Sequence, residues 1–321
     1  MPGTRPAACL TRRHTAAVEA AFAQHCAVTL NPGDAPLNAS ELAGALHDFD
    51  VLVPTVTDLL DASIFLRSPF RTKLIASIGV GVNHIDLPAA SRAGIVVTNT
   101  PDVLTDDTAD IAIALMLMAA RRLGEGERIV RSNSWPGFAP TYHLGQALRG
   151  RTLGIVGYGR IGKAVATRAR AFGLRVQWVG RANGSPAAAD AELAPSLEAL
   201  LASSDIVSLH APATAETRHL MSAARIAQMR PGSILINTAR GPLVDEAALA
   251  AALRTGYLFA AGLDVHEFEP RINPELLRLE NVVLLPHLGS ATNETRTAMG
   301  MRALENVLQW LSGTEPQDRV A

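Results

Sequence analysis

Apolar and polar positions alternate in short blocks through the first hundred residues. Short apolar runs, typical of buried strands, are separated by segments whose apolar residues recur at helical spacing. The runs cover residues 7–11, 28–30, 50–55, 74–79 and 95–100, and the clearest helical segments are 15–25 and 38–47. Strand followed by helix, repeated in this way, predicts a parallel sheet with helices on both faces.

The second half of the chain repeats the pattern more clearly. Its apolar runs, which predict six buried strands, cover residues 152–157, 174–179, 205–210, 233–238, 259–265 and 282–286. Six such strands match a complete doubly wound sheet that binds a dinucleotide. Long helices are predicted near 106–122 and 292–312. Residues 132–150, rich in turn formers and aromatics, predict an excursion that could reach a partner subunit.

Composition narrows the class of protein. A chain of 321 residues with 48% apolar and 18% charged residues fits two well-folded domains. The formal net charge of -1 offers no general attraction to nucleic acid or to an anionic membrane. The longest apolar run, residues 111–120, is too short to cross a bilayer about 30 Å thick.

The two cysteines, Cys9 and Cys26, have no metal-type spacing around them. A disulfide framework is improbable for such a chain, and the N-terminus lacks the apolar core of a signal peptide. We therefore expect a soluble cytoplasmic protein without a bound metal.

The sequence "GYGRIG" at 157–162 fits the glycine pattern of dinucleotide-binding folds. A predicted strand runs into Gly157 and a predicted helix follows from about Arg160. Gly157 would allow a tight turn, Gly159 a close approach to a pyrophosphate, and Gly162 close packing of helix on strand. The phosphates would lie at the helix N-terminus. The alternative is a glycine-rich structural turn.

An acid is expected at the tip of the second strand, where it would hold a ribose hydroxyl. The chain instead has Gly180 and Arg181, and the next acid is Asp190. A guanidinium attracts a 2′-phosphate that a carboxylate would repel. Arg181, helped by Asn183, therefore predicts a preference for NADPH. The alternative is a solvated surface arginine.

Three polar residues follow consecutive predicted strands: Arg240, Glu269 and His287. The carboxyl ends of parallel strands are where doubly wound sheets bind ligands. Arginine's fork suits the carboxylate and keto oxygens of a 2-oxo acid, and a histidine held by a carboxylate suits proton transfer. Singly, the residues could be a helix cap, a solvated acid and a core histidine. Together they predict hydride-transfer chemistry.

The whole pattern resembles the D-isomer-specific 2-hydroxyacid dehydrogenases, nearest to the NADP-dependent glyoxylate/hydroxypyruvate reductases. The resemblance runs from about Cys9 to the final helix. It rests on "SIGVGVNHIDL", "GIVGYGRIG", "SLHAPATAET", "INTARGPLVDEAAL", "GLDVHEFEP" and "LLPHLGSAT".

The resemblance implies two α/β parallel-sheet domains, Rossmann-like and flavodoxin-like, with the active site in the cleft between them. The substrate-binding domain would be residues 1–100 and 291–321, and the dinucleotide-binding Rossmann domain 101–290. The family's catalytic residues map onto Arg240, Glu269 and His287. Its substrate-binding residues map onto Val53, Val80, Gly81 and Arg240.

On the cofactor side the glycine loop, the second strand tip and the resemblance together give a larger set. These expected cofactor-binding residues are Thr108, Gly157, Gly159, Arg160, Ile161, Gly162, Gly180, Arg181, His210, Pro212, Thr217, Thr238, Ala239, Asp264 and Gly289. The family is typically dimeric through the cofactor domain. Residues 132–145, with Trp135 and Phe138, would then border the partner's active site.

The sequence thus predicts a reductase of small 2-oxo acids that prefers NADPH, with NAD as the other cofactor to consider. One alternative is an NAD-dependent dehydrogenase of another D-2-hydroxy acid, in which Arg181 is incidental. A second is a dinucleotide-sensing corepressor, for which no interaction groove or appended segment is visible in the sequence. Turnover distinguishes these hypotheses.

Overall fold

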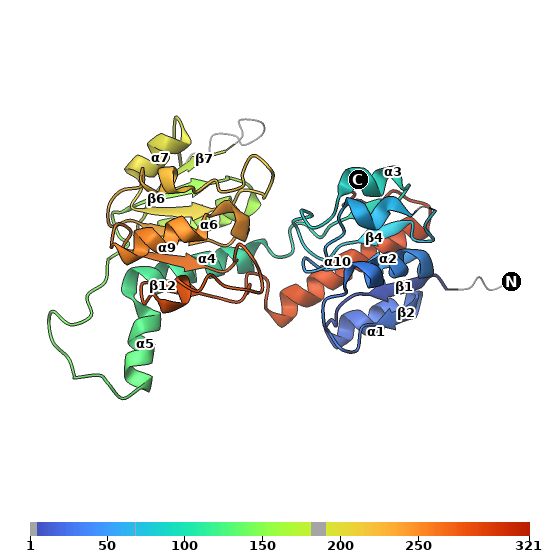
Figure 1. The fold of residues 1–321 in the computed structure, drawn as a ribbon, viewed down its shortest axis with the longest axis horizontal. Helices are drawn as coiled ribbons and strands as arrows, with labels where there is room; N and C mark the ends of the chain where they lie inside the picture. The colour runs from blue at the N-terminus through green and yellow to red at the C-terminus, as the bar shows by residue number, and fades with distance from the viewer. Residues whose placement is uncertain (1–4, 68, 181–190) are drawn as a thin grey trace. The chain divides into compact units, whose positions relative to one another are not determined.

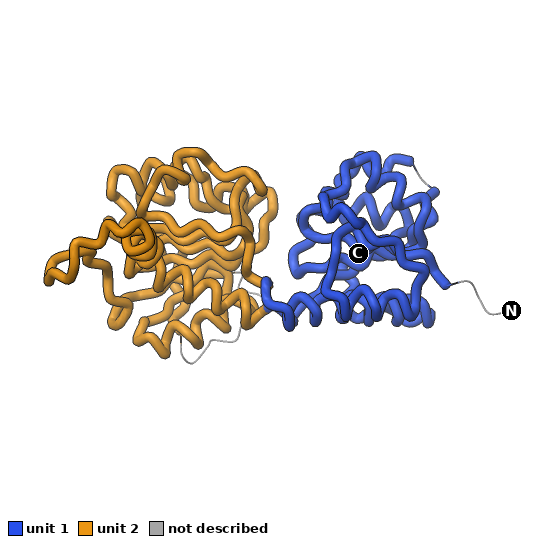
Figure 2. The backbone as a smooth tube through the Cα atoms, turned by 90° about the horizontal axis from the view of Figure 1, so that it is seen from below, with its two compact units in different colours: residues 1–104, 291–321 blue, residues 105–290 orange. Residues whose placement is uncertain are grey.

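The computed structural model describes residues 5–67, 69–180 and 191–321. The chain divides into two compact units (Figure 2). Unit 1 comprises residues 1–104 and 291–321, and unit 2 comprises residues 105–290. Unit 2 is therefore an insertion in unit 1, and each unit has its own sheet.

Unit 1 is built on a parallel sheet in the order β2-β1-β3-β4-β5 (Figure 1). Its strands are β1 (Ala7–Leu10), β2 (Ala27–Leu30), β3 (Val51–Val53), β4 (Leu74–Ala76) and β5 (Val96–Thr98). Its helices are α1 (Ala16–His25), α2 (Ala39–Asp48), η1 (Ala62–Leu66), α3 (Leu87–Arg92) and α10 (Asn293–Leu311). The apolar residues of α2, η1 and α3 form one core with the strands, while α1 packs on α10 and α10 lies against β4.

Unit 2 is a seven-stranded parallel sheet in the order β12-β11-β10-β9-β6-β7-β8. Its strands are β6 (Thr152–Val156), β7 (Arg175–Val179), β8 (Glu192–Leu193), β9 (Ile206–Leu209), β10 (Ile234–Asn237), β11 (Ala260–Leu263) and β12 (Val282–Leu284). The order of the strands reverses between β6 and β9: the chain adds β7 and β8 on one side of β6, and β9 to β12 on the other. Ligands bind doubly wound sheets outside the carboxyl ends of the strands at such a switch point.

Helices cover both faces of this sheet (Figure 1). Apolar residues of α4 (Thr105–Arg121) and α6 (Arg160–Ala171) form one core with the strands, and those of α7 (Leu197–Ser203) and α9 (Glu246–Arg254) form a second core. The shorter helices are α8 (Ala223–Ile226), η2 (Gly241–Leu243) and η3 (Leu276–Arg278). The central strands are buried from both sides, which explains their continuous apolar runs.

Helix α5 (Leu123–Arg131) and the segment after it project from the body of unit 2 (Figure 1). Arg122 has a left-handed backbone conformation, with φ 53°, and separates α4 from α5. No residue of α5 is buried, and residues 132–150 form neither helix nor strand. This segment is the excursion that its turn formers predict.

The predicted strands and long helices are all present with slightly different ends. The predicted number of six strands in unit 2 is wrong, because the sheet has seven. The sheet has a seventh strand, β8, whose two exposed residues pair with β7 at the sheet edge. A strand this short and exposed leaves no apolar run in the sequence. Helices α3 and α5 were not predicted either. Among the described residues, no helix is long and apolar enough to span a membrane.

Candidate active site

The three residues expected after consecutive strands lie at the carboxyl edge of the unit 2 sheet. Arg240 follows β10, Glu269 follows β11 and His287 follows β12, and these strands are parallel neighbours. The structure brings Glu269 and His287 into direct contact: the imidazole Nδ1 donates to the carboxylate Oε2 at 3.0 Å. Both side chains keep about a third of their surface exposed, at 35% and 33%. A histidine oriented by a carboxylate and open on its other nitrogen can exchange a proton with a ligand.

The environment of Glu269 favours its ionised form. Burial alone would raise the pKa of this carboxyl. The hydrogen bond and charge of His287, together with the backbone N–H and ring of His266, outweigh burial and hold the pKa of Glu269 below its ordinary value. Glu269 is therefore an acceptor for His287 in the neutral pH range.

Asp264 fixes the turn that carries His287. Its backbone carbonyl accepts from the N–H of His287 at 2.9 Å. Its carboxylate accepts from the N–H groups of Leu288 at 2.6 Å and Gly289 at 2.8 Å, and Thr108 donates to the Gly289 carbonyl at 3.0 Å. Burial raises the pKa of Asp264, and these two N–H donors oppose the rise. Asp264, Thr108 and Gly289, expected at the cofactor, thus form one cluster beside His287.

Arg240 is held by the end of β10. The side chain of Asn237 accepts from the N–H of Ala239 at 3.0 Å and donates to the Arg240 carbonyl at 2.9 Å. Burial lowers the pKa of the Arg240 guanidinium, and the charge of Glu269 opposes this. Arg240 therefore lies within electrostatic reach of the Glu269–His287 pair. The neighbouring Thr238 hydroxyl is buried, with no hydrogen-bond partner among the described residues.

The glycine loop has the geometry of a dinucleotide cradle. Gly157 has a positive φ of 95°, and a Cβ there would lie 2.7 Å from the His210 backbone. A Cβ on Gly162 would lie 2.3 Å from the Gly157 carbonyl oxygen, so helix and loop touch. Gly159 precedes α6 and has nothing within 4 Å of a Cβ position. Open space at the N-terminus of a long helix suits a pyrophosphate, so these residues fit the expected cofactor.

The loop after β9 closes the other side of this cradle. His210 Nε2 and Ser208 Oγ are 2.9 Å apart, and burial lowers the pKa of His210 to about 4. The imidazole is therefore neutral at pH 7. Further along, Thr217 Oγ1 donates to the Pro212 carbonyl at 2.7 Å, which holds the 212–217 turn.

The expected cofactor residues at the second strand tip are only partly described. Gly180 is exposed at the end of β7, and a Cβ there would lie 3.5 Å from the Tyr158 backbone nitrogen of the glycine loop. Arg181 and Asn183 lie outside the described residues. Arg160 and Ile161 begin α6, beside the open space at Gly159.

The expected substrate residues belong to unit 1. Val53 ends β3 and is buried, and Val80 and Gly81 follow β4. The Asn99 side chain donates to the Val80 carbonyl at 2.8 Å and so braces this loop. No acceptor among the described residues takes the N–H of Val80 or Gly81. Two successive free N–H groups suit a carboxylate.

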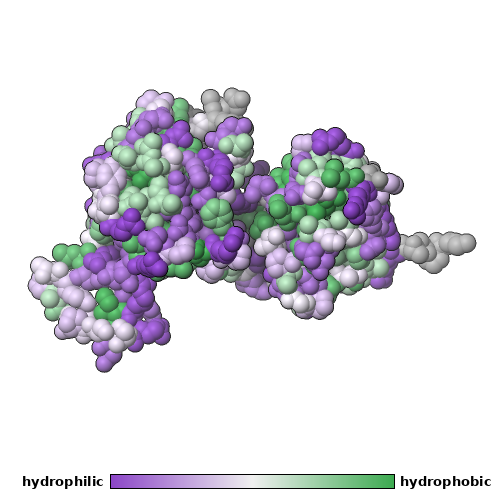
Figure 3. All heavy atoms as spheres, viewed as in Figure 1, coloured by the Kyte–Doolittle hydropathy of each residue, from purple (hydrophilic) through white to green (hydrophobic). Residues whose placement is uncertain are grey.

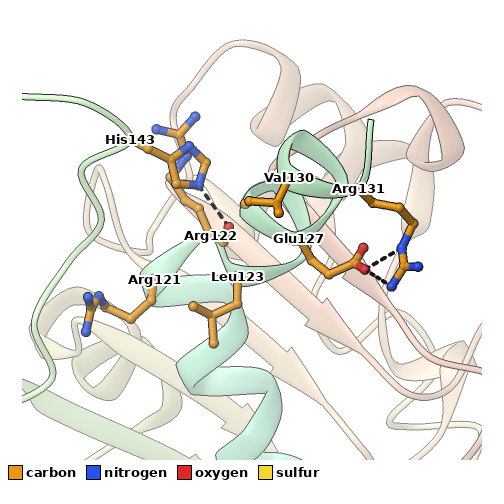
Figure 4. A pocket seen from close by; sticks show the side chains of 8 residues that line it. Arg121, Arg122, Leu123, Glu127, Val130, Arg131 and His143 are labelled. Atoms are coloured by element: carbon orange, nitrogen blue, oxygen red, sulfur yellow. Dashed lines mark hydrogen bonds and ion pairs between the residues drawn. The ribbon is translucent and has the colours of Figure 1, made fainter. Parts of the chain in front are cut away.

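Other features of the described chain lie away from this edge. No group of three or more His, Cys, Asp or Glu side chains among the described residues could hold a metal ion. An open hollow of about 580 Å³ lies where α4 meets α5 (Figure 4). It is lined by side chains that include Arg121, Leu123, Val130 and His143. None of the expected site residues lines it.

The sequence reasoning missed three residues behind the site: Asn237, Glu246 and His266. Asn237 fixes the turn before Arg240, and the His266 backbone N–H donates to Glu269 Oε1 at 2.9 Å. All three lie within the motifs "INTARGPLVDEAAL" and "GLDVHEFEP", but a buried polar side chain looks the same in the sequence as an exposed one.

A doubly wound sheet with this glycine loop and a histidine–carboxylate pair at its carboxyl edge defines a nicotinamide-dependent oxidoreductase. Residues 113–289 match the family model of the NAD-binding domain of D-isomer specific 2-hydroxyacid dehydrogenases. The chain belongs to this family, and the expected resemblance and fold class are confirmed.

Relatives in sequence and in structure agree. The chain is 45% identical over 281 residues to a glyoxylate reductase of Thermococcus litoralis, which covers 86% of this chain and 84% of that protein. A solved structure from Thermus thermophilus superposes with a TM-score of 0.90 at 44% identity, covering 98% of this chain and 100% of that one. An NADPH-dependent glyoxylate/hydroxypyruvate reductase from Sinorhizobium meliloti, in complex with NADP and malonate, gives a TM-score of 0.88 at 34% identity. The superposition covers 99% of this chain and 97% of the Sinorhizobium meliloti chain.

Proposed function

We propose that this protein reduces small 2-oxo acids of the glyoxylate and hydroxypyruvate type to D-2-hydroxy acids, with NADPH as its preferred cofactor. The observation that carries the proposal is the 3.0 Å contact between His287 and Glu269, with Arg240 within electrostatic reach of the pair. The names of the relatives, glyoxylate reductases and a glyoxylate/hydroxypyruvate reductase, support the substrate class.

Each member of the trio has a proposed catalytic role. When bound, the nicotinamide supplies a hydride to the carbonyl carbon. His287 donates a proton from its outer nitrogen to the developing alkoxide, and Glu269 holds the ring and stabilises the imidazolium. Arg240 binds the substrate's carboxylate and keto oxygens as a fork. The assignment of Val53, Val80 and Gly81 to the substrate stays a prediction.

The proposed cofactor site follows the switch point of the unit 2 sheet. The glycine loop and the N-terminus of α6 would bind the pyrophosphate, and the Asp264 cluster with Thr238 and Ala239 would lie toward the nicotinamide. The NADPH preference rests on the sequence: Gly180 stands beside the glycine loop and Arg181 follows it. A guanidinium there would bind the 2′-phosphate.

The test is steady-state reduction of glyoxylate and hydroxypyruvate with NADPH and NADH side by side. We expect turnover of both acids and a lower KM for NADPH, and Arg181→Ala should remove this preference while NADH-dependent rates stay the same. Arg175→Ala is the matched control, because Arg175 is an exposed arginine at the opposite end of β7. Equal use of both cofactors would refute the NADPH preference but leave the reductase. No turnover with either would refute the reductase.

We also propose that the protein is a homodimer through the projecting part of unit 2. Large apolar side chains are exposed there: Val130 (62%), Trp135 (56%), Phe138 (89%) and Leu144 (61%). Apolar atoms are visible among polar ones on this projection (Figure 3), and Leu123 and Val130 border the hollow beside α5 (Figure 4). Exposed aromatic and aliphatic groups gathered on one segment are typical of an interface. The cytoplasmic location stays a prediction.

A further inference from the structure

Two buried ionisable side chains lie directly behind Glu269 and have no part in the proposed reaction. Glu246 begins α9 and is 2% exposed, and His266 follows β11 and is 5% exposed. Glutamate is almost never buried this fully unless it is paired. The charge and hydrogens of these two side chains must therefore be matched within the protein.

Only half of the side-chain polar atoms of Glu246 and His266 have a hydrogen-bond partner among the described residues. Glu246 Oε1 accepts from the backbone N–H of Glu267 at 2.9 Å, and His266 Nε2 donates to the Leu285 carbonyl at 2.9 Å. Among the described residues, Glu246 Oε2 and His266 Nδ1 have no hydrogen-bond partner. Nδ1 lies 3.8 Å from Glu246 Oε1. The unpartnered ring nitrogen therefore lies within ion-pair distance of the Glu246 carboxylate, although no hydrogen bond joins the two side chains.

A single proton reconciles the two groups. A bare ring nitrogen facing a carboxylate offers two acceptors and no donor, whereas one proton on either group makes the contact attractive. We propose that Glu246 and His266 carry one proton between them, on one group or the other, and together act as positioning residues for Glu269. This inference rests on the proposed function of Glu269 and His287.

The pair controls the turn that presents Glu269. The His266 N–H donates to Glu269 Oε1 at 2.9 Å, which leaves Oε2 for His287. The next N–H, that of Glu267, is held by Glu246. Two successive backbone groups of the turn are thus fixed, and their orientation sets the direction of the Glu269 carboxylate.

His266 also supports the loop that carries Arg240. A Cβ on Gly241 would lie 1.9 Å from the His266 carbonyl oxygen, so the two backbones are in contact. A shift of His266 would therefore displace the Arg240–Gly241 backbone as well as Glu269. The pair supports both sides of the proposed catalytic arrangement.

The other charges around the pair have partners of their own. Glu267, beside it, accepts from His219 Nε2 at 2.7 Å and from Arg218 at 3.3 Å. Glu269 has His287. Arg240, on the other side, feels the charge of Glu269. A proton carried by the Glu246–His266 pair is then the compensation available to the Glu246 carboxylate.

The test uses three polar substitutions in the whole protein: Glu246→Gln, His266→Gln and the double variant. Glutamine at 246 keeps an acceptor for the Glu267 N–H, so we expect kcat for glyoxylate to fall about threefold. His266→Gln leaves a buried carboxylate without its proton partner, and we expect kcat to fall about tenfold or more, because displacement of a reacting group is costly. The dissociation constant of NADPH should stay within about twofold, since the cradle is untouched. The double variant should be no worse than His266→Gln, because the two residues act as one unit.

A pH profile separates positioning from a general loss of structure. The ring of His266 helps to hold the pKa of Glu269 low. In His266→Gln the acid limb of kcat/KM should therefore move to higher pH. Glu275→Gln is the control, because it removes a half-exposed carboxylate after the same turn, and it should leave kcat and the acid limb unchanged.

Three results would overturn the inference: additive effects on kcat, an unmoved acid limb, or kcat unchanged by both single variants. If His266→Gln does not fold, Glu246→Gln is compared with Glu275→Gln, and equal kcat for these two variants overturns the inference.

Urea unfolding of the same variants gives a readout without catalysis. Coupling in stability with none in kcat would make the pair structural only. Coupling in stability in a protein that turns over no 2-oxo acid would refute the proposed function and leave the proton carried by the pair.

Discussion

His287 is the residue on which the proposed chemistry depends most directly. One ring nitrogen is engaged by Glu269 and the side chain keeps a third of its surface exposed, so the other nitrogen can meet a ligand. Its backbone has a positive φ of 57°, and Asp264 holds the turn around it. A histidine fixed in this way is positioned for proton transfer, whereas a core histidine would be enclosed on both sides.

Replacing His287 should therefore affect the chemical step rather than binding. We expect His287→Gln to lower kcat by roughly 10²–10⁴-fold, the range for general acid–base catalysis. The dissociation constant of NADPH, measured by fluorescence titration, should change little. His25→Gln, at the exposed end of α1, is the control and should keep full activity. A kcat within a few-fold of wild type would remove His287 from its proposed role.

His210 gives a prediction about pH and stability. Burial lowers the pKa of His210 from 6.5 to about 4. Well above pH 6.5 the side chain is neutral in both the folded and unfolded protein, so it does not affect stability there. As the pH falls toward 4, the unfolded chain binds a proton that the folded chain excludes, and the free energy of unfolding falls. Between pH 7 and 5 this amounts to roughly 2 kcal/mol.

Urea unfolding at these two pH values checks the sign and size. His210→Gln cannot take up a proton, so it should lose roughly 2 kcal/mol less than wild type between pH 7 and 5. All other titrating groups are common to both proteins and cancel in the comparison. Equal losses in the two proteins would show that His210 titrates normally in the folded state.

At the scale of elements, two glycines of one loop should separate folding from cofactor binding. A Cβ on Gly162 would lie 2.3 Å from a backbone oxygen, which cannot move aside as a side-chain end can. Gly162→Ala should therefore destabilise the protein by about 1–3 kcal/mol. Gly159 faces open space, so Gly159→Ala should keep its stability but weaken NADPH binding, because the methyl group would occupy the proposed pyrophosphate site. Urea unfolding and fluorescence titration of both variants test this contrast. Unchanged NADPH affinity in a folded Gly159→Ala would place the pyrophosphate elsewhere.

Elements with continuous apolar runs were predictable, because burial on both sides leaves a pattern along the chain. All the predicted strands of unit 2 are present, and α6 begins at Arg160 as expected. β8 was not predictable, since two exposed residues at an edge carry no such pattern. α5 was missed for another reason: it is short and two of its nine residues are glycine, which has a low helix propensity.

Contacts between strand tips were less accessible to sequence reasoning. The carboxyl-edge location of Arg240, Glu269 and His287 follows from strand order, so the sequence predicts this trio. The supporting contacts of Asn237, Glu246 and His266 depend on side-chain direction and burial. Such properties are fixed by packing across elements that are distant in sequence. The sequence therefore predicts which residues face the ligand better than it predicts which residues hold them.

At the scale of the whole molecule, the projection of unit 2 exposes several large apolar side chains among polar ones (Figure 3). Helix α5 buries none of its own residues, and the described segment 132–150 after it has no regular structure. The far end of the segment is tied back by Gln146: its side chain donates to the Gly232 carbonyl at 3.0 Å, and its backbone N–H donates to the Ala120 carbonyl at 2.7 Å. A segment anchored in this way that exposes aromatic side chains is stabilised when a second surface covers it.

A second copy of the chain is the proposed cover, and a charge on the segment should prevent assembly. Phe138 is 89% exposed and Trp135 is 56% exposed, so replacing both with Asp should leave the isolated fold intact. In an interface, however, the new carboxylates would be buried without partners, which costs several kcal/mol. Sedimentation should give wild type twice the chain mass of 33.9 kDa and the double variant a single chain mass. Leu66→Asp, at a residue of unit 1 that is 79% exposed, is the control and should stay dimeric. A wild-type protein that sediments as one chain would refute the homodimer, and a double variant that stays dimeric would place the interface elsewhere.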